Sequence, residues 1–277
     1  MAAVPVPLSR VCRLPMLWMI LGLCLTLYGS ICLVFFVTQR SFIYFPQPGR
    51  NREIARITLA TAAGQIELAA RPTDSPQALL YFGGNAEDVT LTLPELAAAF
   101  PGRAIYLMQY RGYGGSTGQP TERGLREDAA LAAAFIRERH PQLLLIGRSL
   151  GSSLALGLAA DQPPEHLVLI TPFDSILAIA TRIAPWLPMT WLLQDRWESV
   201  RDAPRVNCPT LILAATDDEI VPAANTARLL QAFPEPGPTV AMIEGTDHNS
   251  ISAAAAFWQV LHQFVATHQP SVADQSP

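Results

Sequence analysis

Hydrophobic positions follow two different patterns along the chain. An uncharged apolar run extends from Leu14 to Val37, between Arg13 and Arg40. Beyond residue 50, short apolar runs typical of buried strands alternate with stretches of helical periodicity. The expected strands are 54–59, 65–70, 78–82, 104–108, 143–146, 167–170, 210–214 and 240–243, and the expected helices are about 91–99, 122–139, 150–160, 223–232 and 252–267. This alternation predicts an α/β fold with a mostly parallel central sheet and helices on both faces.

The N-terminal apolar run has the length of a membrane span. As a helix, its 24 residues extend about 36 Å, against a hydrocarbon core of about 30 Å. A cleaved signal peptide has a shorter apolar region and a small-residue cleavage site. A lipoprotein signal needs a small residue directly before a cysteine, whereas Leu23 precedes Cys24 and Ile31 precedes Cys32. We therefore expect an uncleaved, single-pass anchor.

The chain is expected to divide at the membrane run. Residues 1–38 hold the N-terminal tail and transmembrane helix, 39–50 form a linker, 51–268 form the α/β domain, and 269–277 form a disordered tail. Because Arg10 and Arg13 lie close to the apolar run, we expect a cytoplasmic N-terminus and an α/β domain on the non-cytoplasmic side.

One stretch interrupts the alternation of strands and helices. Residues 173–207 contain three prolines and three tryptophans. At that length the stretch exceeds the usual βα connection of about 2–6 residues. We interpret it as a short cap insertion beside an active site, the alternative being an extra packing helix.

Composition excludes several classes of function. All 19 basic residues are arginine, so a lysine Schiff base and a Walker A phosphate loop are both absent. The net charge of −4 argues against a nucleic-acid partner. The four cysteines form no Cys-x-x-Cys pair, and Cys208 stands alone outside the N-terminal segment. We therefore expect no metal site and no disulfide framework.

A Gly-x-Ser-x-Gly motif identifies a candidate nucleophile. Gly147-Arg148-Ser149-Leu150-Gly151 follows an expected strand and opens an expected helix, as a nucleophile elbow requires. A second match around Ser116 lies in a glycine-rich loop that runs into Pro120, so we assign Ser116 to a structural turn. Ser149 is the predicted nucleophile.

A serine nucleophile needs a base and an acid that orients the base. On this fold the chain order is serine, acid, histidine. The pair Asp217 and Asp218 follows the strand at 210–214, and His248 follows the strand at 240–243. His248 is the predicted base, and on spacing alone either aspartate can be the acid. The other four histidines (His140, His166, His262 and His268) are interpreted as surface or packing residues.

An acyl-transfer site also needs donors for the oxyanion. One is the backbone N–H after the nucleophile, at Leu150, and the other comes from the loop after the third strand. That loop begins Gly83-Gly84-Asn85. We predict that the backbone N–H groups of Leu150 and Asn85 form the oxyanion hole, the alternative for the glycines being a plain turn.

Taken together, these motifs resemble the α/β-hydrolase superfamily. More narrowly, the anchor followed by FIYFPQP, YFGGNAED, YRGYGGSTGQPTERGLREDA, GRSLGSSLAL, TDDEIVP and GTDHN resembles membrane-anchored serine hydrolases, which include depalmitoylases and lysophospholipases, and their bacterial relatives. The resemblance favours Asp218 as the acid, because Val221 and Pro222 complete the family's Asp-x-x-Val-Pro motif. It also indicates that Gly83 replaces a histidine usual in the oxyanion loop.

The resemblance implies a serine hydrolase that cleaves an ester or thioester through an acyl-enzyme, without a cofactor. Because of the anchor, we expect a small-molecule or lipid-like acyl substrate. Two alternatives remain open at this stage. One is a peptidase or acyltransferase on the same fold, and the other is a non-catalytic, hydrolase-like binding protein.

Overall fold

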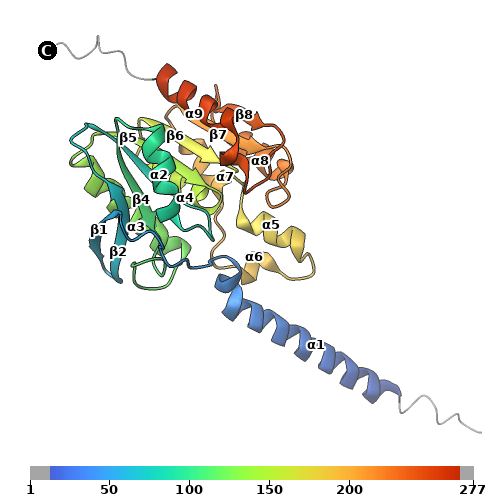
Figure 1. Ribbon diagram of the computed structural model, residues 1–277. Helices are drawn as coiled ribbons and strands as arrows, with labels where there is room; N and C mark the ends of the chain where they lie inside the picture. The colour runs from blue at the N-terminus through green and yellow to red at the C-terminus, as the bar shows by residue number, and fades with distance from the viewer. Residues whose placement is uncertain (1–12, 269–277) are drawn as a thin grey trace, which may run out of the picture.

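A computed structural model of the chain describes residues 13–268 (Figure 1). Within that range it contains one eight-stranded sheet with the order β1-β2-β4-β3-β5-β6-β7-β8. The expected tails, including Arg10 and the stretch 269–277, lie outside the described residues. The α/β fold predicted from the sequence is confirmed.

The strands occur where the apolar runs predict them. They are β1 (Ala55–Thr61), β2 (Gly64–Arg71), β3 (Gln77–Phe82), β4 (Ala104–Gln109), β5 (Gln142–Arg148), β6 (His166–Ile170), β7 (Thr210–Ala215) and β8 (Thr239–Ile243). β1 pairs with β2, and β2 with β4, in antiparallel fashion, while the other neighbours are parallel. The carboxyl ends of β3 to β8 therefore meet at one edge of the sheet.

Helices cover both faces of the sheet. α2 (Val89–Ala99) and α9 (Ala255–Thr267) pack on one face, and α3 (Glu122–Arg137), α4 (Leu150–Asp161) and α8 (Ala223–Leu230) pack on the other. Successive residues of β3 belong to different cores: Tyr81 packs with the α2 and α9 side, and Phe82 with the α3 and α4 side. Both faces of the sheet are buried, so the central strands are apolar throughout rather than alternating.

α1 (Arg13–Thr38) projects away from the body of the molecule (Figure 1). The segment after it, expected as a linker, is packed against the body. It begins with the 3₁₀ helix η1 (Gln39–Phe42), after which Ile43 and Tyr44 are buried in the core on the α3 and α4 side. The chain therefore joins the fold directly at the end of α1.

The insertion at 173–207 contains α5 (Ile176–Ile183), α6 (Met189–Leu192), α7 (Ser199–Asp202) and the 3₁₀ helix η2 (Ala203–Arg205). α5 and α6 lie beside the end of α1 (Figure 1). Trp197 is fully buried, and its backbone N–H donates to Glu122 at 2.9 Å. Its indole N–H donates to the hydroxyl of Tyr44 at 3.2 Å. These bonds tie the insertion both to α3 and to the segment that follows α1.

Candidate active site

Ser149 lies in a sharp turn between β5 and α4. Its backbone adopts φ +51° and ψ −116°, a conformation that non-glycine residues rarely adopt. The backbone N–H of Ser149 donates to the carbonyl of Ile170 at 2.9 Å, which ties the turn to the end of β6. Strain of this kind persists only where the surrounding structure enforces it, and it is the signature of a nucleophile elbow.

The glycines on either side of Ser149 allow backbones to approach closely. A Cβ at Gly151 would lie 2.1 Å from the carbonyl oxygen of Phe82, at the end of β3. A Cβ at Gly147 would lie 2.2 Å from the carbonyl oxygen of Gly151. Any side chain at either position would push α4 away from β3 and β5. The motif is therefore explained by packing around the elbow.

The structure brings Ser149, His248 and Asp218 together from three separate strand ends. His248 Nε2 lies 2.9 Å from Ser149 Oγ, and His248 Nδ1 lies 2.8 Å from Asp218 Oδ2. The side chains of His248 and Asp218 are each only 8% exposed. This linear relay can move a proton from the serine hydroxyl to the imidazole while the carboxylate fixes the ring orientation.

Asp218, not Asp217, contacts the imidazole. Its Oδ1 accepts the backbone N–H groups of Ile220 at 2.9 Å and Val221 at 2.7 Å, which leaves Oδ2 for His248. Asp217 is exposed, and its backbone N–H donates to the carbonyl of Thr246 at 2.9 Å. The turn after β7 therefore presents the two carboxylates in different directions.

The loop that carries His248 is fixed on both sides. Oδ1 of Asp247 accepts the backbone N–H groups of Ser250 and Asn249, and these bonds lower the pKa of the Asp247 carboxyl group. Arg148, next to the serine, donates to the carbonyl oxygens of His248 at 3.2 Å and Asn249 at 2.9 Å. Arg148 thus joins the elbow to the loop after β8.

The two predicted oxyanion donors are the backbone N–H groups of Leu150, which directly follows Ser149, and of Asn85, which follows Gly84; a Cβ at Gly84 would lie 3.9 Å from Ser149 Cβ. Within residues 13–268, the backbone N–H groups of Leu150 and Asn85 have no hydrogen-bond acceptor. The neighbouring N–H of Gly84 is already used, because it donates to Glu87 at 2.8 Å. Both N–H groups are therefore free to donate to a ligand, as the predicted role in binding an oxyanion requires.

Comparison with known sequences now identifies the fold family. The sequence model of the alpha/beta hydrolase family matches residues 82–260. This chain belongs to the α/β-hydrolase family. The resemblance to that superfamily predicted from the motifs is confirmed, and the matched region runs from the end of β3 into α9 of the hydrolase.

Relatives and solved structures cover most of the hydrolase. An uncharacterized protein of Mycobacterium tuberculosis is 34% identical over 76% of this chain and 80% of its own length. Protein bem46 of Schizosaccharomyces pombe is 27% identical over 82% of this chain and 86% of its own. XC6422 of Xanthomonas campestris, described as an a/b serine hydrolase without lid, is 21% identical with a TM-score of 0.57, over 84% of this chain and 99% of that chain. The Pyrococcus furiosus esterase Pf2001 is 12% identical with a TM-score of 0.63, over 81% and 97%. The two structural likenesses support the fold.

The loop after β3 is held by three tyrosines and a glutamate. None of these four residues was predicted to belong to the site. Glu87 accepts the hydroxyl of Tyr81 at 2.9 Å, and burial, followed by the negative charge of Glu87, raises the pKa of Tyr81. Tyr110 donates to the carbonyl of Gly83 at 2.7 Å, and Tyr113 to that of Asn85 at 2.6 Å. Tyr81 and Glu87 fall within the YFGGNAED motif, whereas nothing in the sequence placed Tyr110 and Tyr113 beside it.

Ser116, the serine of the second motif, has a different environment in the hydrolase. Its hydroxyl donates to the carbonyl of Gln109 at 2.7 Å and accepts the backbone N–H of Glu67 at 2.8 Å. These bonds tie the loop to the middle of β2 and to the end of β4. No group of three or more His, Cys, Asp or Glu side chains suited to a metal occurs among residues 13–268.

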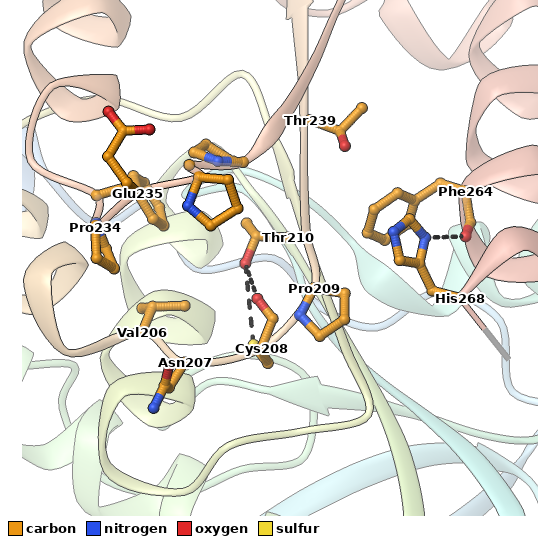
Figure 2. Close-up of a pocket in the computed structure, with 14 residues that line it drawn as sticks. Val206, Asn207, Cys208, Pro209, Thr210, Pro234, Glu235, Thr239, Phe264 and His268 are labelled. Carbon is orange, nitrogen blue, oxygen red and sulfur yellow. Dashed lines mark hydrogen bonds between the residues drawn. The ribbon is translucent and has the colours of Figure 1, made fainter. Parts of the chain in front are cut away.

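A cavity of about 600 Å³ lies at the opposite edge of the sheet (Figure 2). Thr210 and Thr239, the first residues of β7 and β8, line it together with Phe264 and His268. Since Asp218 and His248 follow the other ends of these strands, this cavity is separate from the serine. A smaller hollow of about 240 Å³ borders Asp218 directly and is lined largely by apolar side chains of β7, β8 and α8.

Proposed function

We propose that the protein is a membrane-anchored serine hydrolase that cleaves a carboxylic ester or thioester. The observation that carries the proposal is the 2.9 Å contact between His248 Nε2 and Ser149 Oγ, with Asp218 2.8 Å from the far ring nitrogen. A serine hydroxyl is a weak nucleophile unless a positioned base removes its proton. The buried pair of His248 and Asp218 supplies that base.

The acylation step follows from this geometry. Ser149 Oγ bonds to the acyl carbon while its proton moves to His248 Nε2, and the N–H groups of Leu150 and Asn85 bind the oxyanion. Asp218 stabilises the imidazolium and holds its tautomer. The imidazolium then gives its proton to the leaving alcohol or thiol, and the acyl group remains on the serine.

Water completes the cycle by the same route. A water molecule attacks the acyl carbon while its proton moves to His248 Nε2. The second oxyanion collapses, the carboxylic acid leaves, and Ser149 Oγ recovers its proton from the imidazolium. Each lost oxyanion donor costs about 3–4 kcal/mol in the transition state, so the precise placement of the Asn85 peptide matters to the rate.

We assign membrane anchoring to α1. The apolar helical segment Met16–Phe42 contains an 18-residue stretch with a mean hydropathy of 2.4, and no residue of that stretch is buried. Its 27 residues extend about 40 Å, enough to cross a hydrocarbon core of about 30 Å with some tilt. The residues immediately after it, Ile43 and Tyr44, are buried in the fold, which supports a retained helix over a removable leader.

The position of the site relative to the anchor favours a lipid-like acyl substrate. The carbonyl of Asn85 accepts the backbone N–H of Phe45 at 3.1 Å, and the Asn85 side chain donates to the carbonyl of Ile43 at 3.2 Å. The oxyanion loop is thus bonded to residues five to seven positions beyond Thr38, the last residue of α1. This arrangement supports a loop that lies close to the bilayer surface when α1 spans the membrane.

The test is hydrolysis of a panel of acyl esters, thioesters and lysophospholipids by the purified full-length protein. We expect turnover by the wild type and none above background by Ser149→Ala. Ser116→Ala is the matched control, because it changes the serine of the second motif. It should retain activity while losing stability, since the buried Gln109 carbonyl and the partly buried Glu67 N–H each lose a hydrogen bond, at about 1–3 kcal/mol for a fully buried group. Equal turnover by wild type and Ser149→Ala would refute the proposal.

A further inference from the structure

The tip of the cap insertion, residues 182–191, exposes large apolar side chains. Ile183 is 72% exposed, Trp186 58% and Trp191 84%. Between Ser175 and Gln194 the only charged residue is Arg182. Exposed apolar side chains that gather on a surface mark a site of contact with a membrane or another protein. Tryptophan in particular is enriched at membrane–water interfaces.

The cap tip lies directly against α1. The hydroxyl of Tyr28 donates to the carbonyl of Trp186 at 2.8 Å. An open apolar groove between the two elements is lined by Ile31, Val34, Phe35 and Phe42 of α1 and η1 and by Trp186 and Leu187 of the cap tip. In Figure 1, α5 and α6 stand beside the same end of α1. The cap tip is therefore continuous with the apolar surface of the proposed anchor.

The contact lies well inside the apolar part of α1. Tyr28 is ten residues before Thr38, the last residue of the helix, which corresponds to about 15 Å along its axis. A membrane span needs only about 20 residues, so the last turns of the 27-residue segment Met16–Phe42 can stand in the headgroup region. The level of Tyr28 then falls within the outer part of the hydrocarbon core.

Charged side chains reappear where α1 ends. Arg40 Nε lies 3.0 Å from Asp195 Oδ2, and Arg40 also donates to the side chain of Gln194 at 3.1 Å. Gln39 donates to the carbonyl of Leu192 at 2.9 Å and accepts the backbone N–H of Gln194. A polar layer thus joins the end of α1 to the base of the cap, while the cap tip beyond it is apolar. A protein that enters a leaflet to a fixed depth has this arrangement, with a polar layer at the surface and apolar side chains below it.

We propose that the cap tip is a second membrane contact, which inserts Ile183, Trp186 and Trp191 into the leaflet at the end of α1 nearest the fold. The proposal rests on the membrane anchoring proposed for α1. The bilayer is favoured over a second copy of the chain, because the tip packs along a helix that is itself surrounded by lipid. The cap is then held at the surface of the membrane together with the oxyanion loop.

Quenching of tryptophan fluorescence by brominated lipid tests this contact. The starting variant is the full-length protein with Trp18→Phe, which removes the tryptophan of α1. It is reconstituted into phosphatidylcholine vesicles with or without bromine on the acyl chains. We expect bromine to quench part of the emission. Adding Trp186→Phe and Trp191→Phe should abolish most of that quenching. Trp258→Phe, on α9 with its indole N–H bonded to Ser252, is the matched control and should leave the quenching in place.

Two further measurements distinguish failure of the cap contact from failure of the anchor or of the hydrolase site. Resistance of the protein to alkaline carbonate extraction tests the anchor, and labelling by a fluorophosphonate tests the hydrolase site in each variant. An integral protein that labels normally, but whose quenching is absent or unchanged by Trp186→Phe and Trp191→Phe, would overturn the cap contact alone. That outcome includes occupation of the cap tip by a second copy. Loss of carbonate resistance would overturn the anchoring and, with it, the cap contact.

Discussion

Asp217 and Asp218 are neighbours in the chain but lie in different surroundings. Asp218 bonds to His248 and to two backbone N–H groups, whereas Asp217 is exposed. Replacement of the aspartate by asparagine in a Ser-His-Asp relay lowers kcat by about 10⁴, because the imidazole is then held in the wrong tautomer and its cation is no longer stabilised. We therefore expect Asp218→Asn to lower kcat for an ester by about that factor, and Asp217→Asn to leave it within a few-fold of wild type. The measurement is steady-state kinetics on the best ester of the panel.

The two asparagine variants serve as controls for each other, because they make the same chemical change at adjacent positions. A larger loss in Asp217→Asn than in Asp218→Asn would contradict the assignment of the acid. Equal, small losses in both would indicate that the carboxylate does not orient His248 in the working enzyme.

Cys208 is the only cysteine outside α1 among the described residues, and its thiol is half-buried. Burial raises the pKa of Cys208 to about 11, although a hydrogen bond with Thr210 opposes the change. At pH 8 the thiolate is then about one part in a thousand, and it increases about ten-fold for each pH unit up to pH 11. We expect very slow alkylation by iodoacetamide at pH 8, faster alkylation at pH 10, and rapid alkylation of the unfolded chain at either pH. Peptide mass spectrometry would follow the reaction, and equal rates in folded and unfolded protein at pH 8 would contradict this description.

At the scale of elements, the elbow depends on the close approach of α4 to the end of β3. Gly151→Ala places a methyl group 2.1 Å from a backbone carbonyl, so α4 must shift and move Ser149 away from His248. Overpacking of this kind costs about 1–3 kcal/mol or more. We expect a lower unfolding temperature and a loss of activity that exceeds the loss of folded protein. Both are measured by thermal unfolding and ester hydrolysis on the same preparation.

Gly102→Ala is the control for this prediction. Gly102 lies in the exposed turn after α2, and a Cβ there meets nothing within 4 Å. It should leave both stability and activity close to wild type. Wild-type activity in Gly151→Ala would mean that the elbow tolerates a side chain and that the packing argument is wrong.

Local pattern predicted the elements well, for a physical reason. Strands buried on both faces are apolar throughout, so each appears as a short apolar run between turns, and all eight occur where those runs stand. The elbow was predictable because its strand, turn and helix are adjacent in sequence. The support of the oxyanion loop was not, because Tyr110 and Tyr113 reach it through hydrogen bonds across the fold.

For the molecule as a whole, the segment after α1 is part of the fold rather than a spacer. Tyr44 is 4% exposed and bonds to Asp195 at 3.1 Å, and the backbone of Phe45 bonds to Asn85. A linker was expected at 39–50, because a short polar and aromatic stretch beside the predicted membrane helix carries no periodic pattern. Its burial depends on the cap and the loop after β3, which are distant in sequence.

Two truncated chains test the importance of this segment. A chain that begins at Gln39 keeps Tyr44 and Phe45, whereas one that begins at Asn51 loses both. Loss of a large core aromatic costs about 3–5 kcal/mol, and the loop at Asn85 also loses a partner. We expect the longer chain to fold and to react with a fluorophosphonate in mild detergent, and the shorter one to unfold at a lower temperature and react poorly. Equal stability and labelling of the two chains would contradict a structural role for the segment.

The central claim is that the hydroxyl of Ser149 is activated by His248 at a single site in the folded molecule. Reaction of the full-length protein with a fluorophosphonate, followed by peptide mass mapping of the adduct, tests it most directly. We predict one adduct, on Ser149, that disappears in Ser149→Ala and is strongly reduced in His248→Ala. An adduct on another serine, or undiminished labelling of Ser149→Ala, would contradict the account.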